Sequence, residues 1–244
     1  MKGLEEYKEF EFCRGKLRFV QPKKHRLSIV EILFVANLLG IKRGYKVADL
    51  GAGFGALSIF IALVYNCEVW AIERDEAMLE LIRHNLRINN LESLIKVVEC
   101  DVRQIEKKMD KSSFDCIVIN PPFYPKGGYC YNPYHHEVDT SLKDFISAGS
   151  YLLKDGRGMN ILLSSSRIVE AFYLMEEENI GIKSVRFFYP KPDKNSKIVR
   201  IYGVKNSKTS PTIEKPLIIN KSNGEYTEEV ISYLEEICGI INMI

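Results

Sequence analysis

The tetrapeptide Asn120-Pro121-Pro122-Phe123 follows the apolar run Phe114–Ile119, which reads as a buried strand. Two prolines fix φ and remove two backbone N–H donors, so this turn is stiff and rich in hydrogen-bond acceptors. The Asn120 side-chain oxygen and the Pro121 carbonyl would accept both protons of an amino group, and the Phe123 ring would stack on a flat base. The turn therefore predicts a site that presents an amine. A proline-rich loop with a chance asparagine is the alternative for this stretch alone.

A glycine-rich loop, residues 51–55 with the sequence GAGFG, joins a predicted apolar strand, Lys46–Leu50, to a predicted apolar helix, Ala56–Tyr65. Glycines at such a junction allow a tight turn and a close approach of the backbone to a ligand. Glu73 ends the next predicted strand, where an acid commonly holds a ribose. These features alone also satisfy the relaxed dinucleotide fingerprint, so a nicotinamide-dependent dehydrogenase is an open alternative here.

Two further acids favour a different ligand. Asp49 lies two residues before the first glycine, where a carboxylate would repel a pyrophosphate but would accept hydrogen bonds from an ammonium group. Asp101 follows the third predicted strand and can accept from an adenine amine. Together with the Asn-Pro-Pro-Phe turn, these strand ends line one crevice. The set predicts a nucleoside joined to an amino acid, which describes S-adenosylmethionine.

Apolar runs alternate with helical periodicity along the chain, a cadence typical of an α/β fold with a doubly wound, mostly parallel sheet. We expect seven strands, at residues 46–50, 68–73, 95–100, 114–120, 158–164, 184–189 and 197–204. Helices are expected at residues 27–39, 56–65, 75–89, 140–153, 167–178 and 227–238. The last two strands have no helix between them, so they are expected to pair antiparallel at the sheet edge.

The organisation along the chain predicts one domain over residues 1–244, with residues 1–44 as a lead-in and residues 207–244 as a tail ending in a helix. Residues 1–24 are expected to form a short helix or a hairpin. Residues 124–138 read as an aromatic loop after the Asn-Pro-Pro-Phe turn. The hydrophobic content of 46% supports a proper core.

Cysteine usage and hydropathy predict a soluble, cytoplasmic protein with no membrane segment. The six cysteines form no C-x-x-C pair and several lie in apolar runs, so reduced, mostly buried thiols are expected at Cys13, Cys67, Cys100, Cys116, Cys130 and Cys238. Cys130 with His135 and His136 fits no common zinc spacing, so no metal site is expected. The charged N-terminus lacks a signal-peptide core, and no run approaches the roughly 20 apolar residues of a membrane span.

Net charge is only +2, but basic residues cluster locally. Residues 14–26 carry six Lys or Arg side chains and no acid, and a second group consists of Lys191, Lys194, Lys197 and Arg200. Such groups suit contacts to nucleic-acid phosphates. A solvated charged face is the alternative interpretation.

Residues 47–55, VADLGAGFG, resemble the first motif of class I S-adenosylmethionine-dependent methyltransferases, and residues 120–123 are similar to the amino-methyltransferase signature of that superfamily. The resemblance implies a Rossmann-like methyltransferase fold. It also implies a cofactor-binding set of Asp49, Gly51, Ala52, Gly53, Glu73, Arg74, Asp101, Val102 and Asn120. It implies a catalytic turn made of Asn120, Pro121, Pro122 and Phe123. The methyl-accepting base would contact Phe123 and Tyr124.

The layout is similar to the tRNA1(Val) adenine N6-methyltransferase family over most of the chain. Looser motifs carry this similarity, at residues 21–39, 136–137, 164–166, 200–202, 215–219 and 224–227. The resemblance implies methylation of an adenine N6 in tRNA, at position 37 beside the anticodon, by a monomer or weak dimer. Open alternatives are an rRNA adenine or guanine, a DNA adenine or a protein glutamine as acceptor, and a cofactor-binding module without catalysis. His135 or His136 would be a conceivable base, with surface loop histidines as the simpler interpretation.

Overall fold

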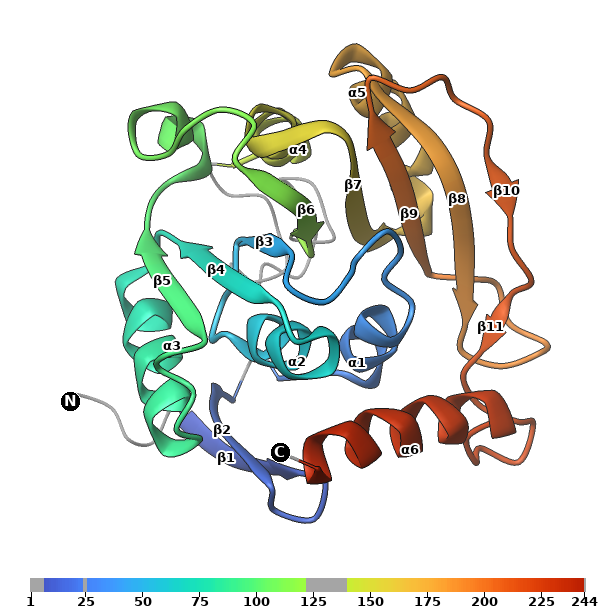
Figure 1. Cartoon of the computed structure of the whole chain (residues 1–244). Coiled ribbons are helices and arrows are strands. Elements are labelled where there is room, and N and C mark those ends of the chain that lie inside the picture. Colours follow the sequence, from blue (N-terminus) through green and yellow to red (C-terminus); the bar gives the residue numbers. More distant parts are fainter. Residues whose placement is uncertain (1–6, 24–25, 122–139, 244) are drawn as a thin grey trace.

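A central sheet organises the computed structural model, which describes residues 7–23, 26–121 and 140–243 (Figure 1). Nine strands form this sheet, in the order β10-β8-β9-β7-β6-β3-β4-β5, with β11 also paired to β8. They are β3 (Lys46–Leu50), β4 (Glu68–Glu73), β5 (Ile95–Glu99), β6 (Phe114–Ile119), β7 (Leu153–Ser164), β8 (Ile180–Tyr189), β9 (Ile198–Lys205), β10 (Thr212–Ile213) and β11 (Leu217–Ile218). The predicted α/β fold is confirmed.

Strand β3 lies at the middle of a parallel block, paired with β4 on one side and β6 on the other, and β5 and β7 extend this block. Strand β9 lies between β7 and β8 and is antiparallel to both of them. The antiparallel strand is therefore β9, and β8 lies beyond it toward the edge of the sheet. The seven predicted strands are all present. The two-residue strands β10 and β11 were not predicted, because segments this short carry no hydrophobic periodicity.

Strand β7 begins at Leu153, earlier than the predicted start at residue 158. Leu153 pairs with Phe114 ahead of a register shift, and Gly156 adopts a φ of +73° within this stretch. A polar, glycine-containing stretch of this kind reads as a loop in the sequence, and its pairing depends on the neighbouring strand.

Helices cover both faces of the sheet (Figure 1). They are α1 (Ile29–Ala36), α2 (Ala56–Tyr65), α3 (Glu76–Ile88), α4 (Leu142–Leu152), α5 (Ile168–Glu177) and α6 (Glu228–Asn242), with a 3₁₀ segment, η2, at Val102–Lys107. One core contains α1, α2, α3 and α6, and the other contains η2, α4 and α5. Alternate residues of β3 enter the two cores: Val47 faces α2, and Ala48 and Leu50 face the opposite side. Asp49 therefore shares the α2 face with Val47.

An antiparallel hairpin, β1 (Tyr7–Phe12) and β2 (Leu17–Pro22), precedes α1 and confirms the hairpin alternative for the N-terminal segment. Asn85 of α3 holds it: the Asn85 side chain accepts from Val20 N at 2.7 Å and donates to Val20 O at 3.0 Å. The same Asn85 Nδ2 donates to the Phe54 carbonyl in the glycine loop at 2.9 Å. One buried amide thus joins the hairpin to the loop that the sequence analysis singled out.

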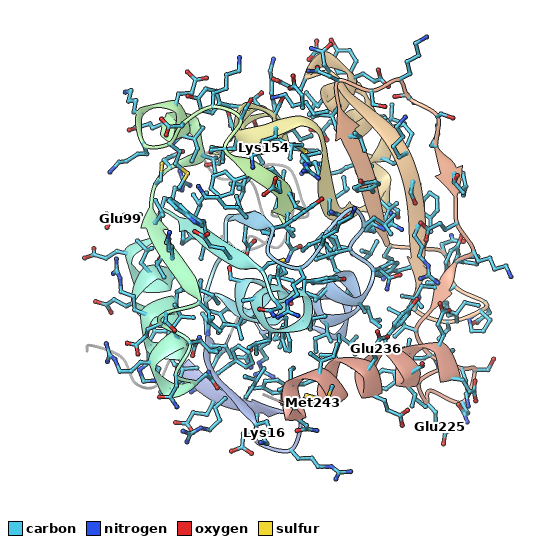
Figure 2. The ribbon with its side chains drawn as sticks, in the orientation of Figure 1. Lys16, Glu99, Lys154, Glu225, Glu236 and Met243 are labelled. Carbon is cyan, nitrogen blue, oxygen red and sulfur yellow. A yellow bond between two sulfur atoms is a disulfide. The ribbon has the colours of Figure 1, made fainter. Side chains whose placement is uncertain are left out.

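A disulfide joins Cys13 in the hairpin turn to Cys238 in α6, with a Cα–Cα distance of 5.2 Å. The prediction that all six cysteines are reduced is therefore wrong for this pair. Both cysteines belong to the core formed around α2, and packing on that core brings them together although 225 residues separate them in sequence. Figure 2 shows Lys16 of the hairpin turn and Met243 after α6 at this same end of the molecule. In the described parts of the chain, no helix is long and apolar enough to cross a membrane.

Candidate active site

The predicted site residues share one edge of the sheet, where the parallel strands β6, β3, β4 and β5 have their carboxyl ends (Figure 1). Asn120 follows β6, Glu73 ends β4 and Asp101 follows β5. Asp49 is in register with Val118, so it lies beside the end of β6. This edge is where open α/β sheets bind ligands.

The glycine loop has a backbone that side-chain-bearing residues rarely adopt. Gly51, Gly53 and Gly55 have φ values of +76°, +57° and +88°. A Cβ on Gly51 would lie 3.0 Å from a ring carbon of Phe145 in α4. The loop thus turns tightly and leads directly into the N-terminus of α2, with Gly55 as the N-cap residue.

Glu73 is held as a fixed acceptor at the end of β4. Its carboxylate accepts from three backbone N–H groups, those of Gly53 at 2.8 Å, Arg74 at 2.8 Å and Asp75 at 2.9 Å. Burial raises the pKa of Glu73, and these three hydrogen bonds oppose the shift. The carboxylate therefore ties the glycine loop to β4 and keeps a set orientation toward the crevice.

Asp49 is the most deeply buried acid of the site, with 1% of its surface exposed. Its Oδ2 accepts from the Ser58 hydroxyl of α2 at 2.6 Å, whereas its Oδ1 is buried and has no hydrogen-bond partner within residues 7–23, 26–121 and 140–243. Burial, as the largest cause, and the nearby carboxylates of Glu73 and Glu31 together raise the pKa of Asp49 to about 7, against the opposing hydrogen bonds from Ser58. A buried acid beside two other acids favours a ligand that brings N–H donors and positive charge.

Asn120 is the second residue with an unsatisfied buried acceptor. Its Oδ1 is shielded from solvent and has no hydrogen-bond partner among the residues that the structure describes, whereas its Nδ2 donates to Oε1 of Glu31 at 3.1 Å. Pro121, the next residue, is buried. An amide oxygen in this state lacks a donor that a bound amine could supply.

Glu31, in the first turn of α1, is a candidate site residue that the sequence did not indicate. It forms a capping box with Ser28: Ser28 N donates to Glu31 Oε2 at 2.7 Å, and the Ser28 hydroxyl accepts from Glu31 N at 3.4 Å. Desolvation raises the pKa of Glu31, and hydrogen bonds from Ser28 and Asn120 oppose this. The Ser-x-x-Glu pattern was a readable signal for the capping box, but its contact with Asn120 spans 89 residues.

Asp101 is already engaged by two arginines. It caps η2 through Arg103 N at 3.0 Å and forms ion pairs with Arg103 at 2.5 Å and Arg74 at 3.1 Å. The Arg103 side chain is the main cause that holds the pKa of Asp101 well below its usual range. Val102, next along the chain, is buried in the core beneath. The proposed adenine contact of Asp101 stays a prediction.

Several predicted residues lie outside the described part of the chain, so their roles also stay predictions. These are Pro122, Phe123 and Tyr124 of the turn, and Cys130, His135 and His136 of the following loop. The structure thus brings together Asp49, the glycine loop, Glu73, Asp101 and Asn120, with Arg74 beside Asp101.

One predicted phosphate contact is wrong. Arg200 is fully buried, and its guanidinium donates to Glu214 at 2.6 Å and to the Ser184 hydroxyl at 3.0 Å. Arg200 is not free for a phosphate contact because its guanidinium is paired with Glu214. Glu214 belongs to the C-terminal tail, which pairs with β8, and β8 in turn pairs with β9, the strand that carries Arg200. Within the other basic group, Lys23 and Arg26 are exposed.

The fold and the site define a class I methyltransferase: a β3 strand leading into a glycine loop, acids on the neighbouring strand ends, and an asparagine-proline turn after β6. The family profile of the methyltransferase small domain matches residues 27–168, more than half of the chain. The chain belongs to this family, and its cofactor is S-adenosylmethionine.

Three relatives illustrate the range of similarity. A Methanocaldococcus jannaschii protein with a methyltransferase name is 36% identical over 121 residues, covering 48% of this chain and 45% of that protein. The tRNA1(Val) (adenine(37)-N6)-methyltransferase of Cytophaga hutchinsonii is 22% identical over 196 residues, covering 78% of this chain and 81% of that protein. The rRNA N(6)-adenosine-methyltransferase metl-5 of Caenorhabditis elegans is 28% identical over 125 residues, covering 50% of this chain and 57% of that protein. The chain thus spans about half the length of two of these relatives.

Solved structures support the fold. The crystal structure of a predicted O-methyltransferase from Agrobacterium tumefaciens superposes with a TM-score of 0.71, over 85% of this chain and 96% of that one, at 21% sequence identity. This similarity concerns the arrangement of the sheet and helices, and the acceptor must be argued from the site.

Proposed function

We propose that this protein transfers a methyl group from S-adenosylmethionine to the N6 amine of an adenine in RNA, with position 37 of a tRNA as the first candidate. The observation that carries the proposal is the buried Oδ1 of Asn120, which lacks a donor at the carboxyl end of β6. Both RNA-modifying relatives described above are named for methylation of adenine N6, and one of them acts on tRNA.

The cofactor would be held by the residues around the glycine loop. Asp49 Oδ1, without a partner, would accept from the ammonium group, directly or through water. Glu73 would accept from the ribose hydroxyls, and Asp101 with Arg74 and Val102 would line the adenine end. The acids Asp49 and Glu73 fit a ligand that carries a positive sulfonium and a positive ammonium. When bound, the cofactor supplies the reactive methyl group.

The chain's own contribution to catalysis is orientation of the amine. Asn120 Oδ1 and the Pro121 carbonyl would each accept one proton of the adenine amino group, which aims the nitrogen lone pair at the methyl group. Alignment of this kind can supply several kcal/mol of barrier reduction. Positive charge grows on the nitrogen during transfer, so the two acceptors bind the transition state more tightly than the ground state. The proton can leave after transfer, so a strong general base is not required.

The base must leave its stack to reach the strand ends, as in other enzymes that modify bases. Anticodon-loop bases are already poorly stacked, which lowers that cost. Phe123 and Tyr124 would supply stacking surface, worth roughly 1–3 kcal/mol per base.

The test is transfer of labelled methyl from S-adenosylmethionine to total RNA, DNA and protein in parallel, followed by digestion and mass spectrometry. The expected product is N6-methyladenosine in the small-RNA fraction. Label in large RNA alone would move the acceptor to rRNA and keep the chemistry. Label only in DNA or protein, or a methylated guanine, would contradict the proposal.

A further inference from the structure

We propose that Glu31 is a positioning residue for the reaction, which holds the Asn120 amide so that Oδ1 faces the methyl-accepting amine. This inference rests on the proposed function, because it assigns to α1 a part in amine methylation.

The geometry leaves the Glu31 carboxylate with two protein donors. Ser28 N donates to Oε2 at 2.7 Å and Asn120 Nδ2 donates to Oε1 at 3.1 Å. A carboxylate offers only acceptors, so the end of the Asn120 amide that faces it must be the NH₂ end. Rotating that amide by half a turn would set its oxygen against the Glu31 oxygen.

An asparagine amide is nearly symmetric in shape, so its orientation has to be imposed. With Oδ1 toward the crevice, the Asn120 side chain can accept a hydrogen bond from an amine. In the reversed orientation, its NH₂ group would face the N–H groups of that amine, and no hydrogen bond would form. Because Asn120 Nδ2 already donates to Glu31, and Oδ1 is shielded with no partner in the described part of the chain, the amide orientation is set before an acceptor binds. Preorganised groups of this kind avoid reorganisation during the reaction.

The anchor for Glu31 comes from its helix. The Ser28 backbone N–H holds the carboxylate at the first turn of α1 through Oε2 at 2.7 Å, and this bond places the carboxylate beside a strand end that is 89 residues away in sequence. A glutamine could not serve both donors, since it has one acceptor oxygen for Ser28 N and Asn120 Nδ2. Its own NH₂ group, turned toward the Asn120 side chain, would favour the reversed amide.

The competing explanation is that Glu31 only caps α1, and the chain offers a matched control for it. Ser28→Ala removes the hydroxyl that accepts from Glu31 N at 3.4 Å, yet it keeps the Ser28 backbone N–H that donates to Oε2. This variant weakens the cap and leaves the Glu31–Asn120 contact in place.

The experiment measures kcat and KM for RNA methylation together with cofactor Kd by calorimetry. We expect Glu31→Gln and Glu31→Ala to lower kcat by about 10- to 100-fold, the usual effect of removing a residue that orients another. Cofactor Kd should stay within about twofold, and Ser28→Ala should keep kcat while lowering Tm. Equal losses of kcat in Glu31→Ala and Ser28→Ala would overturn the proposal.

Two combinations with Asn120 test the link itself. In an Asn120→Ala background, Glu31→Ala should cost nothing more, because the oriented group is gone. Asn120→Asp alone sets two carboxylates against each other, and adding Glu31→Gln should restore part of the activity, since the new glutamine amide donates to the new carboxylate. Multiplicative losses, or no rescue, would contradict the positioning role.

A readout without acceptor separates failure of this inference from failure of the proposed function. The Asn120 side-chain NH₂ signal can be identified in NMR spectra by its loss in Asn120→Ala. Its exchange with solvent should be at least about tenfold faster in Glu31→Ala than in the wild type or Ser28→Ala. Unchanged exchange would overturn the positioning role. A wild type inactive on RNA with the expected exchange pattern would overturn only the proposed acceptor.

Discussion

The Ser58 hydroxyl donates to Asp49 Oδ2 at 2.6 Å, and this bond joins the strand before the glycine loop to the helix after it. It ties down one oxygen of a buried carboxylate and leaves the other, Oδ1, without a partner. The carboxylate therefore lacks much of the solvation that an ionised acid needs. Two consequences for pH dependence follow, one for the cofactor and one for stability.

Cofactor binding should weaken as pH falls below about 7. The pKa of Asp49 in the free protein is raised from 3.8 to about 7, so the carboxyl becomes protonated below that pH, whereas the cofactor ammonium requires the ionised form. Affinity should fall by up to about tenfold per pH unit below 7, with about one proton released on binding. Calorimetry in buffers of different ionisation enthalpy measures both.

Ser58→Ala is the control for that pH profile. The Ser58 hydrogen bond lowers the pKa of Asp49, so its removal should move the fall in affinity to higher pH. A binding constant that is flat from about pH 5 to 8 in both proteins would contradict the assignment of Asp49.

The same carboxylate should destabilise the cofactor-free protein at high pH. Its folded-state pKa lies above its unfolded value, so the folded state holds the proton more tightly, and stability is lost as pH rises from about 4 to 7. Asp49→Asn should therefore raise the free energy of unfolding by a few kcal/mol at about pH 8 and change it little at about pH 4. Denaturant titration of the cofactor-free proteins checks this, and calorimetry should find cofactor binding lost in the variant. Equal stability of the two proteins at high pH would contradict this prediction.

Asn120→Ala should separate catalysis from cofactor binding. The substitution removes an acceptor for the amine but leaves Asp49, Glu73 and the glycine loop untouched, so kcat should fall by about 10²- to 10³-fold, the cost of losing one preorganised group. Cofactor Kd should stay within about twofold. Single-turnover methylation and calorimetry measure the two quantities. A variant with near wild-type turnover would remove Asn120 from the mechanism.

The sequence was enough to place the strand-end residues because their positions follow from the topology of the sheet. Strands β3 and β4 and helix α2 have the predicted bounds, since each is an apolar run with a clear stop, at the glycine loop, at Glu73 or at Asn66. Once these strands are parallel, their carboxyl ends must share one edge. Asp49, Glu73 and Asn120 then belong to one site without any distance being known.

The sequence was insufficient where a role depends on a distant partner. Glu31 reads as a helix cap, Asn85 as an amphipathic helix residue and Arg200 as a basic surface group. The structure adds the contacts of Glu31 with Asn120, of Asn85 with the hairpin and of Arg200 with Glu214, which the local sequence does not indicate. Pairing of Cys13 with Cys238 is of the same kind, because spacing alone does not determine disulfide connectivity.

The disulfide should contribute measurably to stability. It closes a loop with a sequence separation of 225, for which the chain-entropy model gives about 5 kcal/mol, and removal of a native bridge typically costs about 2–5 kcal/mol. Reductant should therefore lower Tm of the wild type but not of the double variant Cys13→Ser/Cys238→Ser.

Alkylation checks the pairing directly. The bridge takes two of the five cysteines that the structure describes, so the unfolded, unreduced protein should take up label at Cys67, Cys100 and Cys116 but not at Cys13 or Cys238. Labelling at Cys13 and Cys238 as well would show that the pair is reduced in solution, and the stability prediction would then fail.

RNA binding should depend on the basic residues beside α1. Lys23 and Arg26 are exposed and lie just before the helix that carries Glu31, so RNA entering the crevice would pass them. The double variant Lys23→Gln/Arg26→Gln should weaken binding and reduce the slope of log K against log salt by about 1–2, since each phosphate contact to a single strand contributes about 0.7. Lys96→Gln is the matched control, because Lys96 pairs with Glu68 near the amino ends of β5 and β4, opposite the site. An equal change of slope in the control would show that the effect comes from net charge alone. An unchanged slope in the double variant would show that Lys23 and Arg26 contact solvent and not RNA.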